Sequence, residues 1–229
     1  PMLVRIAGLG YQRGFGGHFH NDNSITALRD IPGIVVGCPS RGDDAVEMLR
    51  TLAALATVDG RVALFLEPIA LYMTKDLHEA GDGQWLTSYP PQGQAMALGE
   101  GRVYEPDADD LVIFSYGNGV PMSLRAARRI EAAHGWKVRV VDLRWLVPLN
   151  EAFIVEQARS ARRILVVDEG RRSAGVGEGV ITAIAEGGYA ARPFGRVVGA
   201  DTYTPLAGAA FLVIPGDDDI VEAAAKLAG

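Results

Sequence analysis

Short apolar runs alternate with amphipathic segments along this chain, and that alternation limits the folds open to it. Strands are predicted at 2–7, 34–38, 62–66, 111–114, 138–141, 164–167 and 197–198. Helices are predicted at 44–58, about 121–134, 151–160, from the turn at 175–179 to about 186, and 219–228. Strands that alternate with helices of about 10–15 residues are typical of parallel βαβ units. The sequence therefore predicts an α/β protein.

Residues 74–108 interrupt this alternation. They are rich in Gly, Pro, Asp and Gln, show little periodicity, and are predicted to form an extended connection over the surface. They separate two α/β units. Because the first predicted strand begins almost at residue 1, we expect the chain to be a fragment of a longer protein.

The composition is that of an ordinary globular protein and argues against several functions. Apolar residues make up 48% and charged residues 22% of the 229 positions. The net charge of −6, without a basic stripe interleaved with aromatic residues, argues against a nucleic-acid partner. No apolar run approaches the roughly 18 residues that a membrane-spanning helix needs, so no membrane partner is expected.

Cys38 is the only cysteine. A disulfide within the chain and a cysteine-based metal site are therefore excluded. A lone thiol fits a reducing compartment, and we expect a cytoplasmic protein.

The segment 16–24, with the sequence GGHFHNDNS, has the chemistry best suited to meeting a substrate. Two glycines lead into His18 and His20, and polar side chains follow at once. Glycine lets a backbone approach a ligand closely, and imidazole can exchange a proton near neutral pH. We interpret the segment as a substrate-contacting loop. A polar surface loop is the alternative.

Two glycine patterns resemble cofactor motifs but lack their context. Gly81-Asp82-Gly83 resembles the start of the metal–diphosphate motif of thiamine enzymes, which follows a buried strand. No strand is predicted before it here, so we interpret it as connector sequence. The glycines of 175–179 have the spacing G-x-G-x-G, not the G-x-G-x-x-G of dinucleotide-binding loops, and we expect a tight turn into the next helix.

Acidic residues follow two predicted strands. Glu67 is either a site residue or, as we favour, an acceptor for neighbouring backbone N–H groups. Asp168 and Glu169 end the strand at 164–167, at the kind of edge where open α/β sheets bind ligands. That edge could instead face a partner chain. Ser40 is predicted to be the N-cap of the helix that follows it, because an acid stands three residues later.

Four blocks of sequence together resemble the β subunit, or the fused equivalent, of the thiamine-diphosphate-dependent 2-oxoacid dehydrogenase E1 component. They are GGHFHNDNS at 16–24, PGIVV with CPS and DDA at 32–45, FLEP with LY at 65–72, and VDLR with PL at 141–149. VVDE at 166–169 and GAD at 199–201 continue the match. Because the blocks occur in order over nearly the whole chain, the resemblance is more specific than any single motif.

The resemblance implies a fold and a division into domains. Residues 1–100 would be the C-terminal part of a truncated pyrimidine-binding-type α/β domain. Residues 101–229 would form a transketolase C-terminal-type α/β domain.

The resemblance also assigns site residues. His20 matches the family's active-site histidine, which would stand beside the thiazolium carbon of thiamine diphosphate and stabilise an oxyanion or move protons. His18 would be a helper near substrate or cofactor. Asn21, Asp22 and Asn23 would lie in the same vicinity, and they depart from the family's more usual Ser-Gln-Ser.

Cofactors and partners follow from the resemblance as well. Thiamine diphosphate and Mg²⁺ would be bound mostly by parts outside this chain, and no metal ligand is assigned within it. The E1 α subunit or a fused N-terminal half would complete the site, and a lipoylated E2 protein would accept the acyl group. A homodimer of this half is expected, and the isolated chain is expected to be inactive.

Two other functions stay open at this point. A ketol transferase of the transketolase kind would need cationic side chains for a sugar phosphate, and only Arg5, Arg13 and Arg29 flank the segment 16–24. Alternatively, the chain is an assembly or dimerisation module without catalysis of its own.

Overall fold

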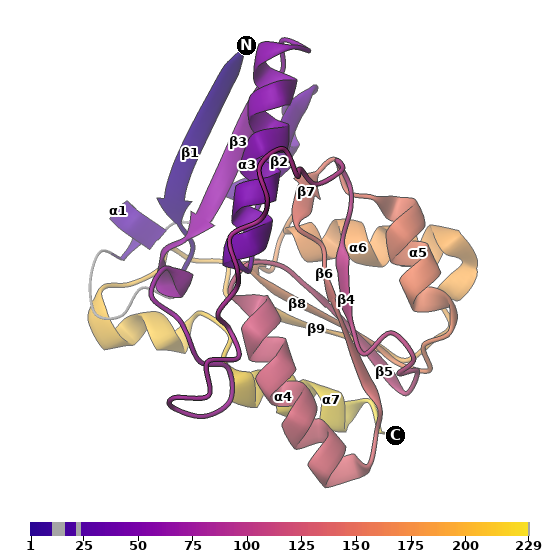
Figure 1. Ribbon diagram of the computed structural model, residues 1–229. Coiled ribbons are helices and arrows are strands. Elements are labelled where there is room, and N and C mark those ends of the chain that lie inside the picture. The colour runs from indigo at the N-terminus through magenta and orange to yellow at the C-terminus, as the bar shows by residue number, and fades with distance from the viewer. Residues whose placement is uncertain (11–16, 22–23, 229) are drawn as a thin grey trace.

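The computed structural model describes residues 1–10, 17–21 and 24–228, with only the backbone of His20 and Asn21, and contains two sheets (Figure 1). The first sheet has the strand order β1-β3-β2-β7. Its strands are β1 (Met2–Gly8), β2 (Ile34–Gly37), β3 (Val62–Pro68) and β7 (Trp145–Val147). β1, β3 and β2 are parallel, and β7 is antiparallel to β2.

The second sheet has the strand order β4-β6-β5-β8-β9. Its strands are β4 (Arg102–Tyr104), β5 (Leu111–Ser115), β6 (Val138–Asp142), β8 (Ile164–Arg171) and β9 (Phe194–Gly199). All are parallel except β4, which is antiparallel to β6.

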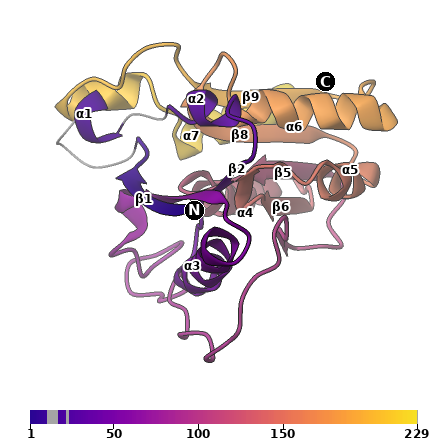
Figure 2. The ribbon, with the colours of Figure 1, turned by 90° about the horizontal axis from the view of Figure 1, so that it is seen from above.

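Helices cover both sheets. The α-helices are α1 (His18–Asn21), α2 (Ile25–Arg29), α3 (Gly42–Thr57), α4 (Gly119–His134), α5 (Glu151–Arg159), α6 (Val176–Ile184) and α7 (Asp217–Lys226). Short 3₁₀ or π turns lie at η1 (Ile69–Leu71), η2 (Ala185–Tyr189) and η3 (Ala207–Leu212). α3 lies along the first sheet, whereas α4 and α7 cover one face of the second sheet and α5 and α6 the other (Figures 1 and 2). Within the described residues, no helix combines the length and apolar character needed to cross a bilayer.

The two sheets share a hydrophobic core. Side chains alternate between the faces of a strand, so Val35 and Phe65 pack under α3 with Met48. Val36 and Leu66 point the opposite way and enter a cluster that also holds side chains of β5, β6, β8, α5 and α6. Because one buried cluster takes residues from both sheets, the sheets are held together by apolar packing.

β7 joins the first sheet although the chain reaches it directly from β6 of the second sheet. In the turn between them, Arg144 has a left-handed backbone with φ of 58°. Its carbonyl accepts a hydrogen bond from the Cys38 N–H at 2.7 Å. Trp145, 1% exposed, packs under α3. The chain itself therefore links the two sheets, through this turn and β7.

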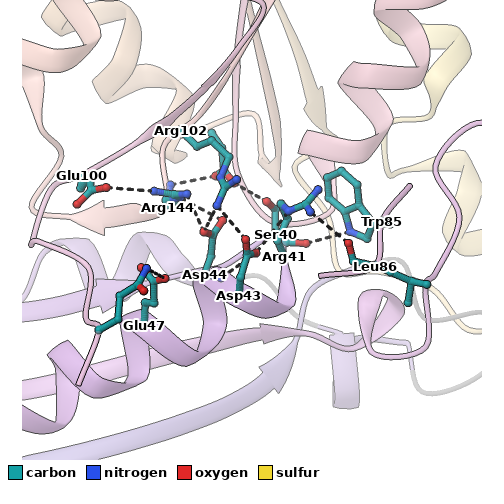
Figure 3. A network of polar contacts seen from close by, with 12 residues as sticks. Ser40, Arg41, Asp43, Asp44, Glu47, Trp85, Leu86, Glu100, Arg102 and Arg144 are labelled. Carbon is teal, nitrogen blue, oxygen red and sulfur yellow. Dashed lines mark hydrogen bonds and ion pairs between the residues drawn. The ribbon is translucent and has the colours of Figure 1, made fainter. Parts of the chain in front are cut away.

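A buried ionic network lies where the N-terminus of α3 meets this turn (Figure 3). The Asp44 carboxylate accepts from Arg144 Nε at 3.2 Å and Nη2 at 2.7 Å, and both side chains are at most 5% exposed. Arg102 Nη2 of β4 donates to Asp44 at 2.7 Å and to Asp43 at 3.1 Å. These ion pairs therefore hold α3, which packs on the first sheet, to β4 of the second sheet and to the turn between β6 and β7.

Ser40 takes part in this junction and does not cap α3, so the predicted N-cap is wrong. α3 begins at Gly42 with Arg41 in the cap position, and no side chain caps the helix. The Ser40 hydroxyl donates to the carboxylate of Asp142 at the end of β6. Burial raises the pKa of Asp142 to about 7. Ser40 therefore stabilises the contact between the two sheets and not the N-terminus of α3.

The α/β class with mostly parallel sheets, predicted from the sequence, is confirmed. Every predicted strand is present, and residues 74–101 of the predicted connection hold no helix or strand. The sequence missed β4 and β7, two short antiparallel strands at sheet edges, and the short helices α1 and α2. The domain boundary at residue 100 and the pyrimidine-binding character of the first part stay predictions.

Removing one partner of the buried ion pair should cost more than removing both. Arg144→Met leaves the Asp44 carboxylate buried without its main partner, and we expect the free energy of unfolding to fall by about 3–5 kcal/mol. The double variant Asp44→Leu/Arg144→Met removes the buried charge as well, and should recover most of that loss. Urea denaturation at neutral pH measures both changes.

Arg129→Met is the matched control. The partner of Arg129, Asp218, is 91% exposed, and such a surface pair contributes only about 0–1 kcal/mol. A loss in Arg144→Met no larger than in this control would contradict the importance given to the buried pair.

Candidate functional site

The candidate site lies at the carboxyl edge of the first sheet. Because β1, β3 and β2 are parallel, their carboxyl ends meet at one edge. The segment that contains the histidines follows β1 at this edge, and its helix α1 lies close to the end of β1 (Figure 1). Glu67 lies near the end of β3 at the same edge.

His18 is exposed and belongs to a small aromatic cluster. Its ring centroid is 4.2 Å from that of Phe19 and 5.1 Å from that of Tyr203. The Arg171 guanidinium lies 5.3 Å from the Tyr203 ring centroid. The predicted helper histidine is therefore at the surface, against a residue that follows the second sheet.

The other predicted site residues are described only in part. His20 and Asn21 form the last two positions of α1, but their side chains lie outside the described part of the structure. Asp22 and Asn23 lie wholly outside it. The roles of these four residues remain predictions.

The helix α2, which follows α1, is held by the segment before α6. Thr26 Oγ1 donates to the Ala174 carbonyl at 3.1 Å. The Arg29 Nη1 donates to the same carbonyl at 3.3 Å and to the carbonyl of Gly175. These hydrogen bonds join α2, which precedes β2 of the first sheet, to the loop between β8 of the second sheet and α6. Residues of the second sheet's connections therefore hold α2 in place beside the site.

A cleft of about 400 Å³ opens near the ends of β1 and β3. Arg5, Glu67 and Tyr72 line it together with Arg41 and Trp85. Its remaining walls are mostly apolar, which is the usual make-up of a small-molecule pocket. The cleft and the histidine segment lie at the same edge of the sheet.

Glu67 is the anionic centre of this cleft. Its carboxylate accepts from Arg5 Nε, from Arg5 Nη2 at 3.0 Å, and from the Tyr72 hydroxyl. The hydrogen bond from Arg5 holds the pKa of Glu67 below its usual range, and burial raises the pKa of Tyr72 to about 12. The favoured sequence interpretation, capping of backbone N–H groups, is wrong, because the partners are side chains.

The Glu67 pair should show a defined pH dependence. Since its pKa is lower in the folded protein than in the unfolded chain, the pair stabilises the fold above pH ~4.3 and loses that effect as the pH falls through the folded pKa. Arg5 is 66% exposed, so Glu67→Gln should lower the free energy of unfolding by only about 1 kcal/mol at pH 7. The difference should be smaller at pH 3 than at pH 7, as measured by urea denaturation.

Glu79→Gln serves as the control for that experiment, because Glu79 pairs with Arg128 on an exposed surface. It should change the free energy of unfolding by less than about 0.5 kcal/mol at both pH values. An effect of Glu67→Gln that stayed equal at pH 7 and pH 3 would rule out the ionic pair as its cause.

The Gly81-Asp82-Gly83 sequence is connector, as predicted. The Asp82 carboxylate accepts hydrogen bonds from the backbone N–H groups of Gln84, Glu79, Leu77 and His78, at 2.7–3.0 Å. These bonds hold the pKa of Asp82 well below its usual range. Among the described residues, no group of three His, Cys, Asp or Glu side chains is arranged to hold a metal ion. The carboxylate therefore organises its own loop.

The glycines of 175–179 form a tight turn into α6, which confirms the sequence interpretation. The Gly177 N–H donates to Asp168 Oδ2 at 2.7 Å, and a Cβ at Gly175 would lie 2.6 Å from the same oxygen. The N-terminus of α6 is thus filled by the protein's own carboxylate. Asp168 Oδ1 accepts from the Gly170 N–H at 2.8 Å and the Tyr116 hydroxyl at 2.6 Å.

Glu169, the next residue, is turned toward the first sheet. It is 3% exposed, and its carboxylate accepts from Asn118 Nδ2 at 2.9 Å and from the Asn118 N–H at 3.3 Å. Burial raises the pKa of Glu169 to about 8 and that of the nearby Cys38 thiol well above its ordinary value. Asp168 and Glu169 are therefore both buried, and the hydrogen bonds described for their carboxylates come from residues of this chain. The inert thiol is no candidate nucleophile.

Sequence reasoning did not bring Arg5, Glu67 and Tyr72 together. A signal was present, since Arg5 and Glu67 are the charged residues within two otherwise apolar strands. Only the parallel pairing of β1 with β3, which puts Arg5 opposite Phe65, makes them neighbours on one face. Tyr72 carries no comparable signal.

Comparison with known proteins identifies the class. Residues 99–215 match the family model described as the transketolase C-terminal domain. Together with the two-sheet fold, this match shows that the chain belongs to the transketolase C-terminal domain family.

Two individual proteins that are similar to this chain indicate a more specific group of relatives. The chain is 31% identical over 217 residues to the pyruvate dehydrogenase E1 component subunit beta of Staphylococcus aureus, covering 92% of this chain and 62% of that protein. It is 32% identical over 225 residues to the 3-methyl-2-oxobutanoate dehydrogenase subunit beta of Mycobacterium tuberculosis, covering 97% and 59%. These matches confirm the resemblance to E1 β subunits. The chain spans about three fifths of the length of these relatives.

A solved structure supports the fold alone. A split-gene transketolase, described as an inactive beta4 tetramer, superposes with a TM-score of 0.68 at 20% sequence identity. The superposition covers 98% of this chain and 65% of the other.

Proposed function

We propose that this chain is part of a thiamine-diphosphate-dependent 2-oxoacid dehydrogenase E1 component. The whole enzyme decarboxylates a 2-oxoacid and transfers the acyl group to a lipoylated E2 protein. The observation that carries the proposal is the similarity to E1 β subunits over more than nine tenths of the chain. The candidate site at the carboxyl edge of the first sheet agrees with it, because ligands bind at such edges in α/β folds.

In this proposal His20 is the proton-handling residue. An imidazole has an unperturbed pKa near the working pH, which suits it to move a proton or stabilise negative charge during the reaction. The position of α1 beside the ends of β1 and β3 supports this role. His18, Asn21, Asp22 and Asn23 would contact substrate or cofactor around it.

The described residues do not fit the metal–diphosphate part of the cofactor. No set of three His, Cys, Asp or Glu side chains among them could hold Mg²⁺, and the Asp82 carboxylate is engaged by backbone N–H groups. Thiamine diphosphate and Mg²⁺ would therefore be held mostly by an E1 α subunit or a fused N-terminal half.

The remaining partners follow from the same proposal. The chain would form a homodimer of this half within a cytoplasmic enzyme, and would be inactive alone. The residues 1–100 would act as the pyrimidine-binding part and 101–229 as the transketolase C-terminal-type part.

His20→Ala in the full protein tests the catalytic role. Loss of a general acid–base should lower the rate of 2-oxoacid decarboxylation by about 10²–10⁴-fold. His78→Ala is the control, because His78 lies in the connection and the hydrogen bond described for it, to Asp82, comes from its backbone N–H and not from its side chain. A wild-type rate of decarboxylation and acyl transfer in His20→Ala would remove the assigned role.

The split-gene transketolase described as an inactive beta4 tetramer favours one alternative, an assembly module. Under the main proposal the isolated chain holds only part of a cofactor site, so titration with thiamine diphosphate and Mg²⁺ should give no measurable heat. Binding by the chain alone would contradict that half-site view. The fold also permits a ketol transferase, and assays with sugar phosphates against 2-oxoacids separate the two reactions.

A further inference from the structure

We propose that Arg29 is a positioning residue, which fixes the end of the histidine segment (residues 16–24) from which α2 begins. The inference deepens the proposed function and rests on it for its catalytic consequence. Arg29 is the last residue of α2, and its guanidinium donates to carbonyl groups of the loop between β8 and α6. Because α2 begins directly after the segment, the contacts that hold α2 also hold this end of the segment.

The short helix α2 needs support from outside itself. It has five residues, too few for a helix to be stable through its own hydrogen bonds. Ile25 is 4% exposed and enters the core that the two sheets share. Thr26 Oγ1 donates to the Ala174 carbonyl at 3.1 Å, and Arg29 Nη1 donates to the same carbonyl at 3.3 Å and to that of Gly175. Apolar packing and these three hydrogen bonds therefore hold α2.

The loop that receives Arg29 is fixed by residues of its own side of the molecule. Ala174 has a left-handed backbone, with φ of 56°, although it is not glycine. Its N–H donates to Glu178 Oε2 of α6 at 2.9 Å. Ser173 donates to the Asp201 carboxylate through its N–H at 2.8 Å and its hydroxyl at 2.6 Å. These contacts hold the Ala174 carbonyl in place without help from α2, and unfavourable backbone conformations held in this way cluster at functional sites.

The helix α6 leaves room for the guanidinium at Gly179. A Cβ there would lie 2.5 Å from Arg29 Nη2. Glycine inside a helix is less favourable than alanine, so this position loses helix stability and gains the close approach of Arg29. A Cβ at either of the other two glycines of 175–179 would lie 2.6 or 3.2 Å from Asp168 Oδ2. The glycine pattern that resembles a cofactor loop therefore accommodates two side chains of this chain.

The other described end of the segment also rests on connections of the second sheet. Gly17 is buried with φ of +47°, and a Cβ there would lie 2.9 Å from Leu206 Cδ2 and 3.2 Å from the Thr204 carbonyl oxygen. In Figure 2, α1 lies beside the yellow segment that precedes α7. The second sheet's connections therefore hold the segment near both described ends, at Gly17 and through Arg29.

Arg192 provides a matched control. Like Arg29, it is partly buried and donates to backbone carbonyl groups. Its Nη1 donates to Ala158 at 2.9 Å and to Ala161, and its Nη2 donates to Arg159 at 2.6 Å. These carbonyls lie at the end of α5 and just beyond it. Arg192→Met therefore removes hydrogen bonds of the same kind without involving α2.

Amide hydrogen exchange by NMR on this chain tests the inference. The Ala27 and Ile31 amides donate to carbonyls within and just before α2. In Arg29→Met both should exchange about tenfold or more faster than in the wild type. In Arg192→Met both should stay within about threefold of the wild type, even where urea denaturation shows an equal loss of global stability. Unchanged exchange in Arg29→Met, or equal acceleration in the two variants, overturns the inference.

Gly179→Ala keeps the test decisive if Arg29→Met does not fold. Alanine favours the helix α6, but its Cβ would displace the Arg29 guanidinium from the carbonyl groups. The Ala27 and Ile31 amides should again exchange about tenfold faster, even where urea denaturation shows no loss of global stability. Wild-type exchange of both amides in this variant would contradict the role given to Arg29.

Kinetics of the full enzyme separate the inference from the function on which it rests. Together they predict a kcat about tenfold lower, with KM within about threefold, in Arg29→Met but not in Arg192→Met. Faster exchange in α2 with an unchanged kcat would uphold the positioning role and contradict the function given to the histidine segment.

Discussion

The pairing of Arg144 with Asp44 is the contact on which the arrangement of the two sheets depends. Both side chains are at most 5% exposed. Without Arg144, the buried Asp44 carboxylate would keep only the partly exposed Arg102 as a partner, which makes the loss of Arg144 costly. The Arg144 carbonyl also accepts from the Cys38 N–H, and β7 begins at the next residue. One arginine therefore connects α3, the end of β2 and the strand that crosses between the sheets. The pair determines the relative orientation of the two sheets more than the strength of their association, because the apolar core that they share supplies the buried area.

Because the two sheets pack together in this way, acidic residues at the carboxyl edge of the second sheet are buried. In an open α/β sheet that edge binds ligands, but here Asp142, Asp168 and Glu169 are all buried there. Each accepts hydrogen bonds from protein groups, and Asp142 accepts from Ser40 on the first sheet's side. The edge left for chemistry is that of the first sheet, with the histidine segment and the Arg5–Glu67–Tyr72 cleft. The similarity to E1 β subunits agrees with a site at that edge.

The elements that the sequence predicted well are those with a local signal. Apolar runs of four or more residues predicted the central strands, and glycine spacing indicated the turns at 81–83 and 175–179. β4 and β7 have three residues each, too few for a period to be visible, and pair only at sheet edges. Ser40 and Glu67 were misassigned because each bonds a side chain from another strand instead of its own neighbouring backbone.

The amino-acid sequence by itself determined the α/β class and the order of the strands along the chain, and it predicts the histidine segment as the place for chemistry. These properties depend on residue type and spacing within short windows. Only the tertiary structure decided that β7 pairs with β2, that Asp44 pairs with Arg144, and that the Ser40 hydroxyl donates to Asp142. Each of these contacts joins residues far apart in the chain. Their energy comes from burial and from hydrogen-bond geometry, which exist only once the two sheets have packed together.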